Sequence, residues 1–182
     1  MNFITTPLSG LVVIEPQIWN DDRGYFIETY NEKVFRANGL HETFVQDNLS
    51  YSHRGVLRGM HAQSGPQAQG KLVRVLRGSV LDVVVDIRKQ SDTFGQSFSM
   101  RLDADKATSL WIPAGFLHGF LALEDHTIFT YKVTGLYDKG GELGVRWDDP
   151  DLGIAWPATG DELIISEKDR LLPRLKEITS PF

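Results

Sequence analysis

Two polar segments that lie far apart in the chain carry the residue types used in acid–base chemistry. The first is Arg58-Gly59-Met60-His61-Ala62-Gln63, with Lys71 close behind it. The second is Pro113-Ala114-Gly115-Phe116-Leu117-His118-Gly119-Phe120. Its Pro-x-Gly-x-x-His pattern is typical of small β-barrels, where proline and glycine shape a turn that directs the histidine inward. We interpret the two segments as two halves of one pocket.

A metal-binding barrel would carry His-x-His followed by Glu in the first segment. Here the corresponding residues are His61, Gln63 and then Lys71. An ammonium group repels a metal cation, and one or two imidazoles fall short of the three or four ligands that a divalent ion requires. We therefore expect no metal, and a pocket that performs acid, base and anion chemistry.

Each of these candidates also has a structural interpretation. A lone histidine in a strand, such as His61, is often a hydrogen-bonded structural residue, and His118 is as readily a turn residue as a substrate contact. Lys71 suits the edge of a sheet, where charge opposes aggregation. Tyr131 lies in the alternating run Phe129-Thr130-Tyr131-Lys132, where aromatics are core residues by default. The polar surroundings of His61 favour the functional interpretation.

Asp169 has two interpretations that the spacing alone leaves open. It completes the capping box Ser166-x-x-Asp169 at the start of a short helix. Alternatively, its carboxylate accepts a hydrogen bond from Nδ1–H of an imidazole, fixes the tautomer and leaves Nε2 as a general base. Residues 61 and 169 can meet only through the fold.

Two further segments suit recognition of a phosphorylated ligand that carries a base or a sugar. Arg23 lies in the turn Asp21-Asp22-Arg23-Gly24, and a planar guanidinium suits bidentate capture of phosphate. The run Gln46-Asp47-Asn48 offers amide donors and acceptors of the kind that read a base or a sugar.

The composition narrows the class of protein. A chain of 182 residues with 41% hydrophobic and 24% charged residues suits one globular domain with a substantial core. The absence of cysteine fits a reducing cytoplasm. We expect no export signal, because residues 1–7 lack a basic stretch, and no membrane span, because no apolar run is long enough to cross a membrane. The net charge of -5 disfavours a nucleic-acid surface.

Many short apolar runs separated by turn signals predict an all-β sandwich or barrel. We expect strands over residues 11–14, 25–30, 43–45, 55–57, 72–76, 80–87, 98–102, 109–112, 120–123, 128–133 and 145–147, with a hairpin at Gly78-Ser79. Helices are expected after Asn31, ending at Gly39, and after Ser166. We predict a single domain over residues 1–182, with an irregular, proline-containing C-terminal arm from about Asp149.

Motifs in order along nearly the whole chain carry a family resemblance. They are Asp22-Arg23-Gly24-Tyr25-Phe26, Phe44-Val45-Gln46-Asp47-Asn48, Val56-Leu57-Arg58-Gly59-Met60-His61, Gly70-Lys71-Leu72-Val73-Arg74, Val83-Val84-Val85-Asp86-Ile87-Arg88, Trp111-Ile112-Pro113-Ala114-Gly115-Phe116-Leu117-His118-Gly119-Phe120, Gly153-Ile154-Ala155-Trp156-Pro157 and Ser166-Glu167-Lys168-Asp169. Taken together, these motifs resemble the dTDP-4-dehydrorhamnose 3,5-epimerase family.

The resemblance implies a cupin-like barrel, that is, a double-stranded β-helix or jelly roll, which works without metal or cofactor. It implies epimerisation at C3 and C5 of dTDP-4-dehydro-6-deoxy-D-glucose through enolate intermediates. The product, dTDP-4-dehydro-L-rhamnose, leads to dTDP-L-rhamnose. The resemblance also implies a cytoplasmic homodimer whose N-terminal strand crosses to the partner.

The resemblance further implies a role for each candidate. His61 would be the base, paired with Asp169. Tyr131 would be the acid on the opposite face, and Lys71 would face the 4-keto oxygen. The substrate-binding residues would be Arg23, Phe26, Glu28, Gln46, Asp47, Asn48, Arg58, His118, Tyr137, Glu142 and Lys168. Of these, Tyr137 would stack on thymine, while Arg23 and Glu28 would serve the neighbour's site.

Two residues depart from the family pattern Arg-Gly-Leu-His-Phe-Gln, where this chain has Met60 and Ala62. Methionine conserves the volume of leucine, but alanine removes a whole ring. If that ring faces the pocket, the sugar would sit differently, and the set of epimerised carbons would change.

Three other functions remain open at this point. A 3-only or 5-only epimerase would keep the base and present the ring differently to the acid. A metal-dependent cupin oxygenase or isomerase is disfavoured by Gln63 and Lys71. A non-catalytic nucleotide-sugar binding module would be expected to lack His61, Tyr131 or Asp169, and all three are present.

Overall fold

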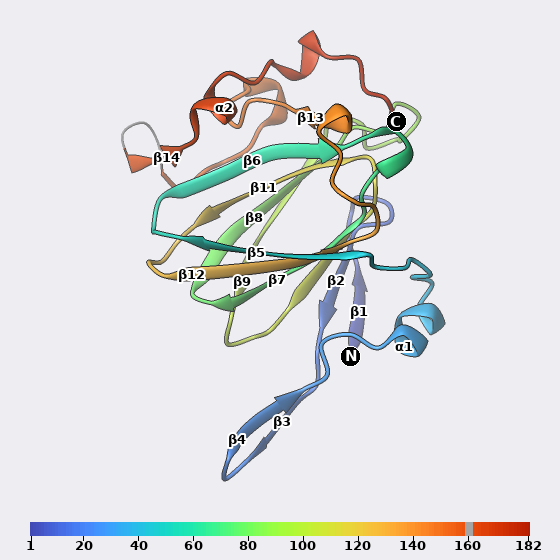
Figure 1. The fold of residues 1–182 in the computed structure, drawn as a ribbon, viewed down its shortest axis with the longest axis vertical. Coiled ribbons are helices and arrows are strands. Elements are labelled where there is room, and N and C mark those ends of the chain that lie inside the picture. The colour runs from blue at the N-terminus through green and yellow to red at the C-terminus, as the bar shows by residue number, and fades with distance from the viewer. Residues whose placement is uncertain (159–161) are drawn as a thin grey trace.

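Two six-stranded sheets lie face to face in the computed structural model, which describes residues 1–158 and 162–182 (Figure 1). The first sheet has the strand order β1 (Asn2–Thr5), β2 (Val12–Glu15), β10 (Ser109–Ile112), β7 (Lys71–Arg77), β12 (Thr127–Val133) and β5 (Gln46–Ser52). The second is ordered β13 (Glu142–Gly144), β6 (Val56–Gln63), β11 (Phe116–Ala122), β8 (Ser79–Asp86) and β9 (Ser97–Asp103), and β14 (Ile164–Ile165) adds to β6 in parallel. The predicted all-β jelly roll of the cupin type is confirmed.

The main core fills the space between the two sheets. Val73 of β7 and Phe129 of β12 pack there against Val84 of β8 and Phe120 of β11. Because side chains alternate across a strand, the neighbouring residues of these strands point to the outer faces. The inner faces of the two sheets therefore form the walls of any pocket between them.

The outer face of the second sheet is also buried. Val83, Val85 and Leu117 pack there against the chain that follows β13. This segment contains η3 (Pro150–Leu152), α2 (Glu167–Arg170) and η5 (Leu175–Glu177), and it lies over β6 in Figure 1. Burial on both faces explains the nearly continuous apolar runs of β8 and β11.

The predicted helix after Asn31 is confirmed as α1 (Glu32–Ala37). The Asn31 side chain accepts a hydrogen bond from the Val34 amide, and Gly39 follows the helix with a φ of +83°. Phe35 of α1 packs with Ile14 and Trp111 on the outer face of the first sheet. No helix among the residues described is long and apolar enough to cross a membrane.

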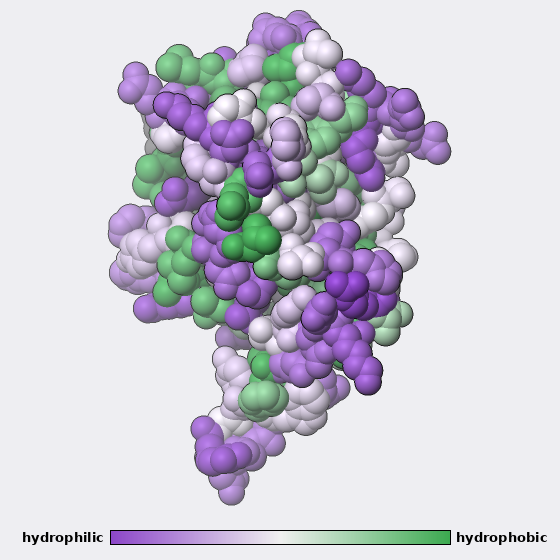
Figure 2. Space-filling model, turned by 45° about the vertical axis from the view of Figure 1, so that its right-hand side comes forward, coloured by the Kyte–Doolittle hydropathy of each residue, from purple (hydrophilic) through white to green (hydrophobic). Residues whose placement is uncertain are grey.

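A separate two-stranded hairpin, β3 (Ile18–Asp21) with β4 (Gly24–Ile27), projects away from both sheets (Figure 1). It forms the protrusion at the lower end of the space-filling view in Figure 2. Its aromatic side chains are open to solvent: Tyr25 is 70% exposed and Phe26 is 67% exposed.

The predicted strands differ from the observed ones where polar residues face inward. Residues 43–45 are not a strand; the strand is β5, whose inward residues are polar and whose exposed residues include Leu49 and Tyr51. The prediction missed β1, β3 and β14, and it ended β6 too early and began β11 too late. It also extended β4 to residue 30 and placed β13 at residues 145–147.

The predicted hairpin at Gly78-Ser79 is wrong. The strands on either side, β7 and β8, belong to different sheets and do not pair with each other. The chain crosses there from one sheet to the other, and Gly78 has a φ of +75° at the crossing. A turn signal alone does not distinguish such a crossing from a hairpin.

Candidate active site

A pocket of about 590 Å³ opens between the two sheets. Of the residues predicted from the sequence, Arg58, His61, Lys71, His118, Tyr131, Lys168 and Asp169 line it. His61 and His118 belong to the second sheet, whereas Lys71 and Tyr131 belong to the first. The imidazoles and the phenol therefore enter the pocket from facing walls.

Two glycines bring the histidine-bearing strands together. His61 of β6 is the direct cross-strand partner of His118 of β11, and the register shifts between His118 and Phe120. Beside them, Gly59 has a φ of +134°, and a Cβ on it would lie 2.5 Å from Gly119 Cα. Any larger residue at Gly59 would force the strands apart, so glycine is required for this close approach.

His61 is paired with Asp169. Its Nε2 lies 2.7 Å from Asp169 Oδ1, and the Gly59 amide donates a longer bond of 3.4 Å to Oδ2. Burial raises the pKa of the Asp169 carboxyl, but the His61 hydrogen bond and charge and the Gly59 bond outweigh that effect and hold the pKa below its usual value. The carboxylate is therefore ionised at neutral pH.

This geometry corrects the predicted ring nitrogen. We expected Asp169 to bind Nδ1, but it binds Nε2, which leaves Nδ1 without a partner among the described residues. Asp169 approaches His61 from α2, on the Nε2 side of the ring. The two interpretations of Asp169 also combine: its amide donates to Ser166 Oγ at 3.1 Å as in a helix cap, while its carboxylate turns to His61.

Lys71 places an ammonium group in the wall opposite His61. Its Nζ lies 3.5 Å from the His61 carbonyl oxygen. Burial lowers the pKa of Lys71 to about 8, and the negative charge of Asp82 opposes that effect. The side chain is therefore mostly cationic at neutral pH.

Tyr131 and Arg58 complete the inner part of the pocket. Burial raises the pKa of the Tyr131 phenol, and the charge of Arg58 opposes that rise only in part. The phenol is therefore protonated at neutral pH and able to donate a proton. The Arg58 guanidinium donates to Ser52 Oγ and to the Tyr51 carbonyl oxygen, each at 3.2 Å, which fixes it beside β5.

A polar chain of side chains lies at the rim. Lys168 donates to Glu142, and the Tyr137 hydroxyl donates to the same carboxylate at 3.5 Å. The hydrogen bond from Lys168 holds the pKa of Glu142 below its ordinary value, and the same bond raises the pKa of Lys168. The ion pair links α2 to β13.

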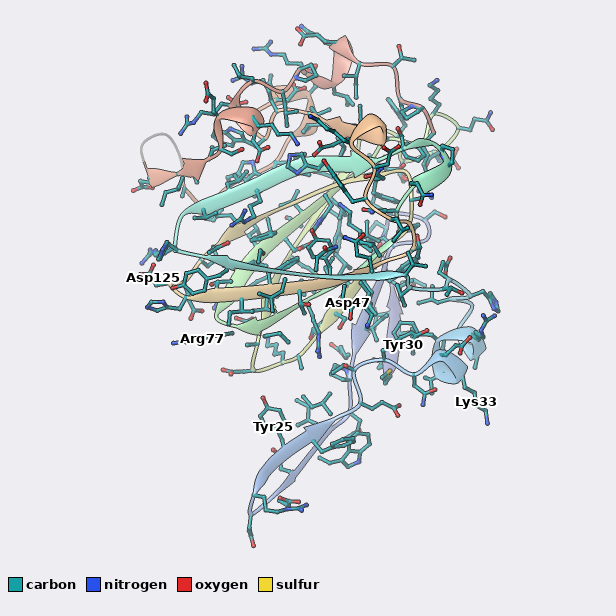
Figure 3. All side chains as sticks on the ribbon, viewed as in Figure 1. Tyr25, Tyr30, Lys33, Asp47, Arg77 and Asp125 are labelled. Carbon is teal, nitrogen blue, oxygen red and sulfur yellow. The ribbon has the colours of Figure 1, made fainter. Side chains whose placement is uncertain are left out.

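The side chains of Gln46, Asp47 and Asn48 point to the two faces of β5. Gln46 donates to Asn48 Oδ1 at 2.8 Å, and its own oxygen accepts from the Tyr137 amide at 3.2 Å. Asp47 points away from β6 and the pocket (Figure 3) and binds Lys132 at 2.9 Å. Strand alternation thus separates Asp47 from the two amides.

The hairpin residues do not reach the pocket of their own chain. Arg23 forms an ion pair with Asp21 at 2.6 Å, and its side chain is 90% exposed. Phe26 lies on the projecting β4, directly after Tyr25 in the chain, and Figure 3 labels Tyr25 on this hairpin. Glu28 accepts a hydrogen bond from Asn31 at 3.1 Å.

Sequence reasoning missed Asp82 and Ser50. Asp82 lies behind the pocket, where its Oδ2 accepts a 2.9 Å hydrogen bond from His118 Nε2. Its signal was a carboxylate in the middle of the apolar run of β8. Ser50 lines the pocket with a buried hydroxyl that has no partner among the described residues, and nothing in its local pattern marks it.

Met60 and Ala62 point away from the pocket. Both belong to the cluster on the outer face of the second sheet, with Val145 and Leu152. The ring missing at Ala62 therefore changes the packing under the C-terminal segment and not the pocket wall.

The chain is similar to known proteins over nearly its whole length. A family model described as dTDP-4-dehydrorhamnose 3,5-epimerase matches residues 5–177. The chain is 54% identical over 176 residues to dTDP-4-dehydrorhamnose 3,5-epimerase from Methanothermobacter thermautotrophicus, covering 96% of this chain and 95% of the relative.

Two solved structures extend the comparison. A dTDP-6-deoxy-D-glucose-3,5-epimerase from Legionella pneumophila, in complex with dTDP-4-keto-L-rhamnose, has a TM-score of 0.93 and 44% identity over 98% of this chain and 94% of that chain. A 3'-monoepimerase from Streptomyces bikiniensis, in complex with dTDP-quinovose, has a TM-score of 0.88 and 35% identity over 95% of this chain and 87% of that chain. The chain belongs to the dTDP-4-dehydrorhamnose 3,5-epimerase family and is an isomerase.

Proposed function

We propose that the protein inverts C3 and C5 of dTDP-4-dehydro-6-deoxy-D-glucose by acid–base chemistry without a metal, giving dTDP-4-dehydro-L-rhamnose for dTDP-L-rhamnose synthesis. One observation carries the proposal: the His61–Asp169 pair lies on one wall of the pocket, and Tyr131 and Lys71 lie on the facing wall.

The first step is removal of a proton next to the ketone. The free Nδ1 of His61 takes the proton from C3, and the C–H electron pair moves into an enolate whose charge rests on the C4 oxygen. Asp169 stabilises the imidazolium that forms. The Lys71 ammonium meets the developing oxyanion, an effect that commonly contributes a factor of about 10² to 10³ in rate.

The second step returns a proton to the opposite face. The Tyr131 phenol donates to C3 as the enolate reverts to the ketone, which inverts the carbon. Solvent restores the proton on Tyr131 and removes the proton from His61. The same sequence at C5 completes the reaction, and each correctly placed acid or base contributes about 10²- to 10⁴-fold.

Positive charge in and around the pocket suits a nucleoside diphosphate. Arg58 and Lys168 line the pocket with Lys71, and Tyr137 at the rim offers a ring for stacking on the base. The solved Legionella relative supports a dTDP-sugar as the ligand, since it binds dTDP-4-keto-L-rhamnose.

We further propose a homodimer in which the β3–β4 hairpin docks on the partner. An isolated two-stranded hairpin is marginally stable in water, and this one exposes Tyr25 and Phe26. Docking would bring Arg23, Phe26 and Glu28 to the neighbour's pocket. The cytoplasmic location and the single-domain organisation remain predictions.

The second candidate is a 3-only epimerase, which the similarity to the Streptomyces bikiniensis 3'-monoepimerase favours. One experiment separates the two. The purified protein is incubated with the dTDP-ketosugar in D₂O, and deuterium and configuration at C3 and C5 are followed by NMR. Deuterium and inversion at both carbons are expected; change at C3 alone would establish the second candidate, and no change at either carbon would refute both.

We predict that activity is independent of added metal. Among the residues that the structure describes, no three His, Cys, Asp or Glu side chains are arranged to hold a metal ion. Dialysis against a chelator is expected to leave the rate of epimerisation unchanged, with untreated enzyme in the same buffer as the control. Loss of turnover that a divalent ion restores would contradict the prediction.

A further inference from the structure

Asp82 is a buried carboxylate that the mechanism above does not use. It lies on β8 between Val80 and Val84, which belong to the core between the sheets, and it is 0% exposed. Burying a carboxylate in an apolar core is costly unless partners compensate for the lost hydration. Only Oδ2 has a partner, His118 Nε2 at 2.9 Å; the buried Oδ1 has none among the described residues.

The direct partner of the Asp82 carboxylate is the His118 imidazole. His118 lies between it and the pocket, with its ring stacked on Phe129 at a centroid distance of 6.0 Å. The other carboxylates near the pocket are already engaged: Asp169 binds His61, and Glu142 binds Lys168. The charge of Asp82 also acts on the Lys71 side chain, whose pKa it raises without a direct contact.

We propose that Asp82 is a positioning residue for the epimerisation: it orients the His118 imidazole and supplies a buried negative charge behind the pocket that Lys71 shares with His118. This inference rests on the proposed function. Asp82 is not among the residues that line the pocket, so it acts through His118 and Lys71 and not on the sugar itself.

Lys71 shares the pocket with titratable and charged groups from several elements. Arg58 and His61 face the pocket from β6, His118 from β11, Tyr131 from β12, and Lys168 and Asp169 from α2. Of these groups Arg58 and Lys168 are cationic, the His61 base becomes cationic when it takes the proton, and Asp169 is paired with His61. Burial lowers the pKa of Lys71 to about 8, and the negative charge of Asp82 opposes that lowering.

The test replaces Asp82 with the isosteric amide. In Asp82→Asn, Lys71 is expected to lose its proton at lower pH, and the high-pH side of the kcat/KM profile is expected to move down by roughly one pH unit. Inhibition by dTDP, measured at pH 6.5, is expected to change little, because the variant leaves the lining residues in place.

Asp86→Asn is the matched control. Asp86 is equally buried on the inward face of the same strand, but its partners are Arg88, Ser91 and Thr93, outside the pocket. This variant tests the effect of losing a buried carboxylate from β8. It is expected to change thermal stability without moving the pH profile.

A second readout does not depend on activity. Trace acetylation of lysine amines across pH, read by peptide mass spectrometry, reports the fraction of Lys71 that is unprotonated. The midpoint is expected near pH 8 in the unmodified sequence, lower in Asp82→Asn and unchanged in Asp86→Asn. If the protein does not act on the dTDP-ketosugar, the proposed function is refuted, but the effect of Asp82 on the Lys71 midpoint can still be measured.

The proposal is overturned if Asp82→Asn leaves both the Lys71 midpoint and the pH profile unchanged, or moves them no more than Asp86→Asn does. Should Asp82→Asn not fold, Asp82→Glu replaces it, since it keeps the charge and displaces the carboxylate relative to His118. The expected result is then a lower kcat with the Lys71 midpoint retained, and an unchanged kcat overturns the proposal.

Discussion

His61 and Tyr131 enter the pocket from facing sheets, which separates proton removal from proton return. His61→Asn is expected to abolish both solvent exchange and epimerisation, because no enolate forms. Tyr131→Phe is expected to keep exchange and lose most inversion, since His61 can return a deuteron to the face from which it took the proton. NMR in D₂O measures both effects, and dTDP binding serves as the control for folding. Loss of exchange in Tyr131→Phe with intact dTDP binding would contradict the two-face assignment.

The charge of Lys71 is needed mainly when the enolate forms. Lys71→Met is expected to lower kcat/KM by about 10²-fold or more, while dTDP affinity changes only a few-fold. With a pKa of about 8, the active cationic form of Lys71 is lost as pH rises, so the unmodified sequence should lose activity above about pH 8. Steady-state kinetics across pH and calorimetry with dTDP measure these quantities. Equal losses in kcat/KM and dTDP affinity would mean that Lys71 is only a substrate clamp.

At the scale of the element, the short helix α2 carries Asp169, the hydrogen-bond partner of the His61 base. Ser166 Oγ accepts the amide hydrogen of Asp169 and so sets the start of the helix. Ser166→Ala is expected to destabilise the fold by about 1 kcal/mol and to lower kcat several-fold by displacing Asp169 from His61. Ser166→Thr, which keeps the hydroxyl, is the matched control and is expected to restore most of kcat. Thermal unfolding and kinetics measure the two effects; a normal kcat in a destabilised Ser166→Ala would contradict the link.

At the scale of the molecule, the projecting hairpin leads us to predict active sites that two subunits share. If each site joins the body of one subunit to the hairpin of the other, a heterodimer of Arg23→Ala with His61→Ala contains one intact site and one site with both defects. Mixing the two inactive homodimers is therefore expected to restore activity as subunits exchange. Mass spectrometry of differently tagged subunits confirms exchange, and mixing two His61→Ala preparations is the control. Confirmed exchange without activity would contradict site sharing.

Local sequence patterns determined much of this protein. The spacing of short apolar runs predicted an all-β sandwich or barrel, which the family resemblance narrowed to a jelly roll, and Asn31 and Gly39 predicted both ends of α1. These features depend on side-chain alternation and capping, which act over a few residues. The motif residues His61 and Lys71 were also identifiable, because polar side chains in an inward-facing strand are unusual.

Only the tertiary structure decided which residues of the active site contact one another. It brought Asp169 to Nε2 of His61, turned Ala62 away from the pocket and placed Asp82 behind His118. It also made Gly78 a crossing between sheets and not a hairpin. Each of these outcomes depends on which strands pair and in what register, and that pairing is set by contacts between residues far apart in the chain, so no local pattern contains it.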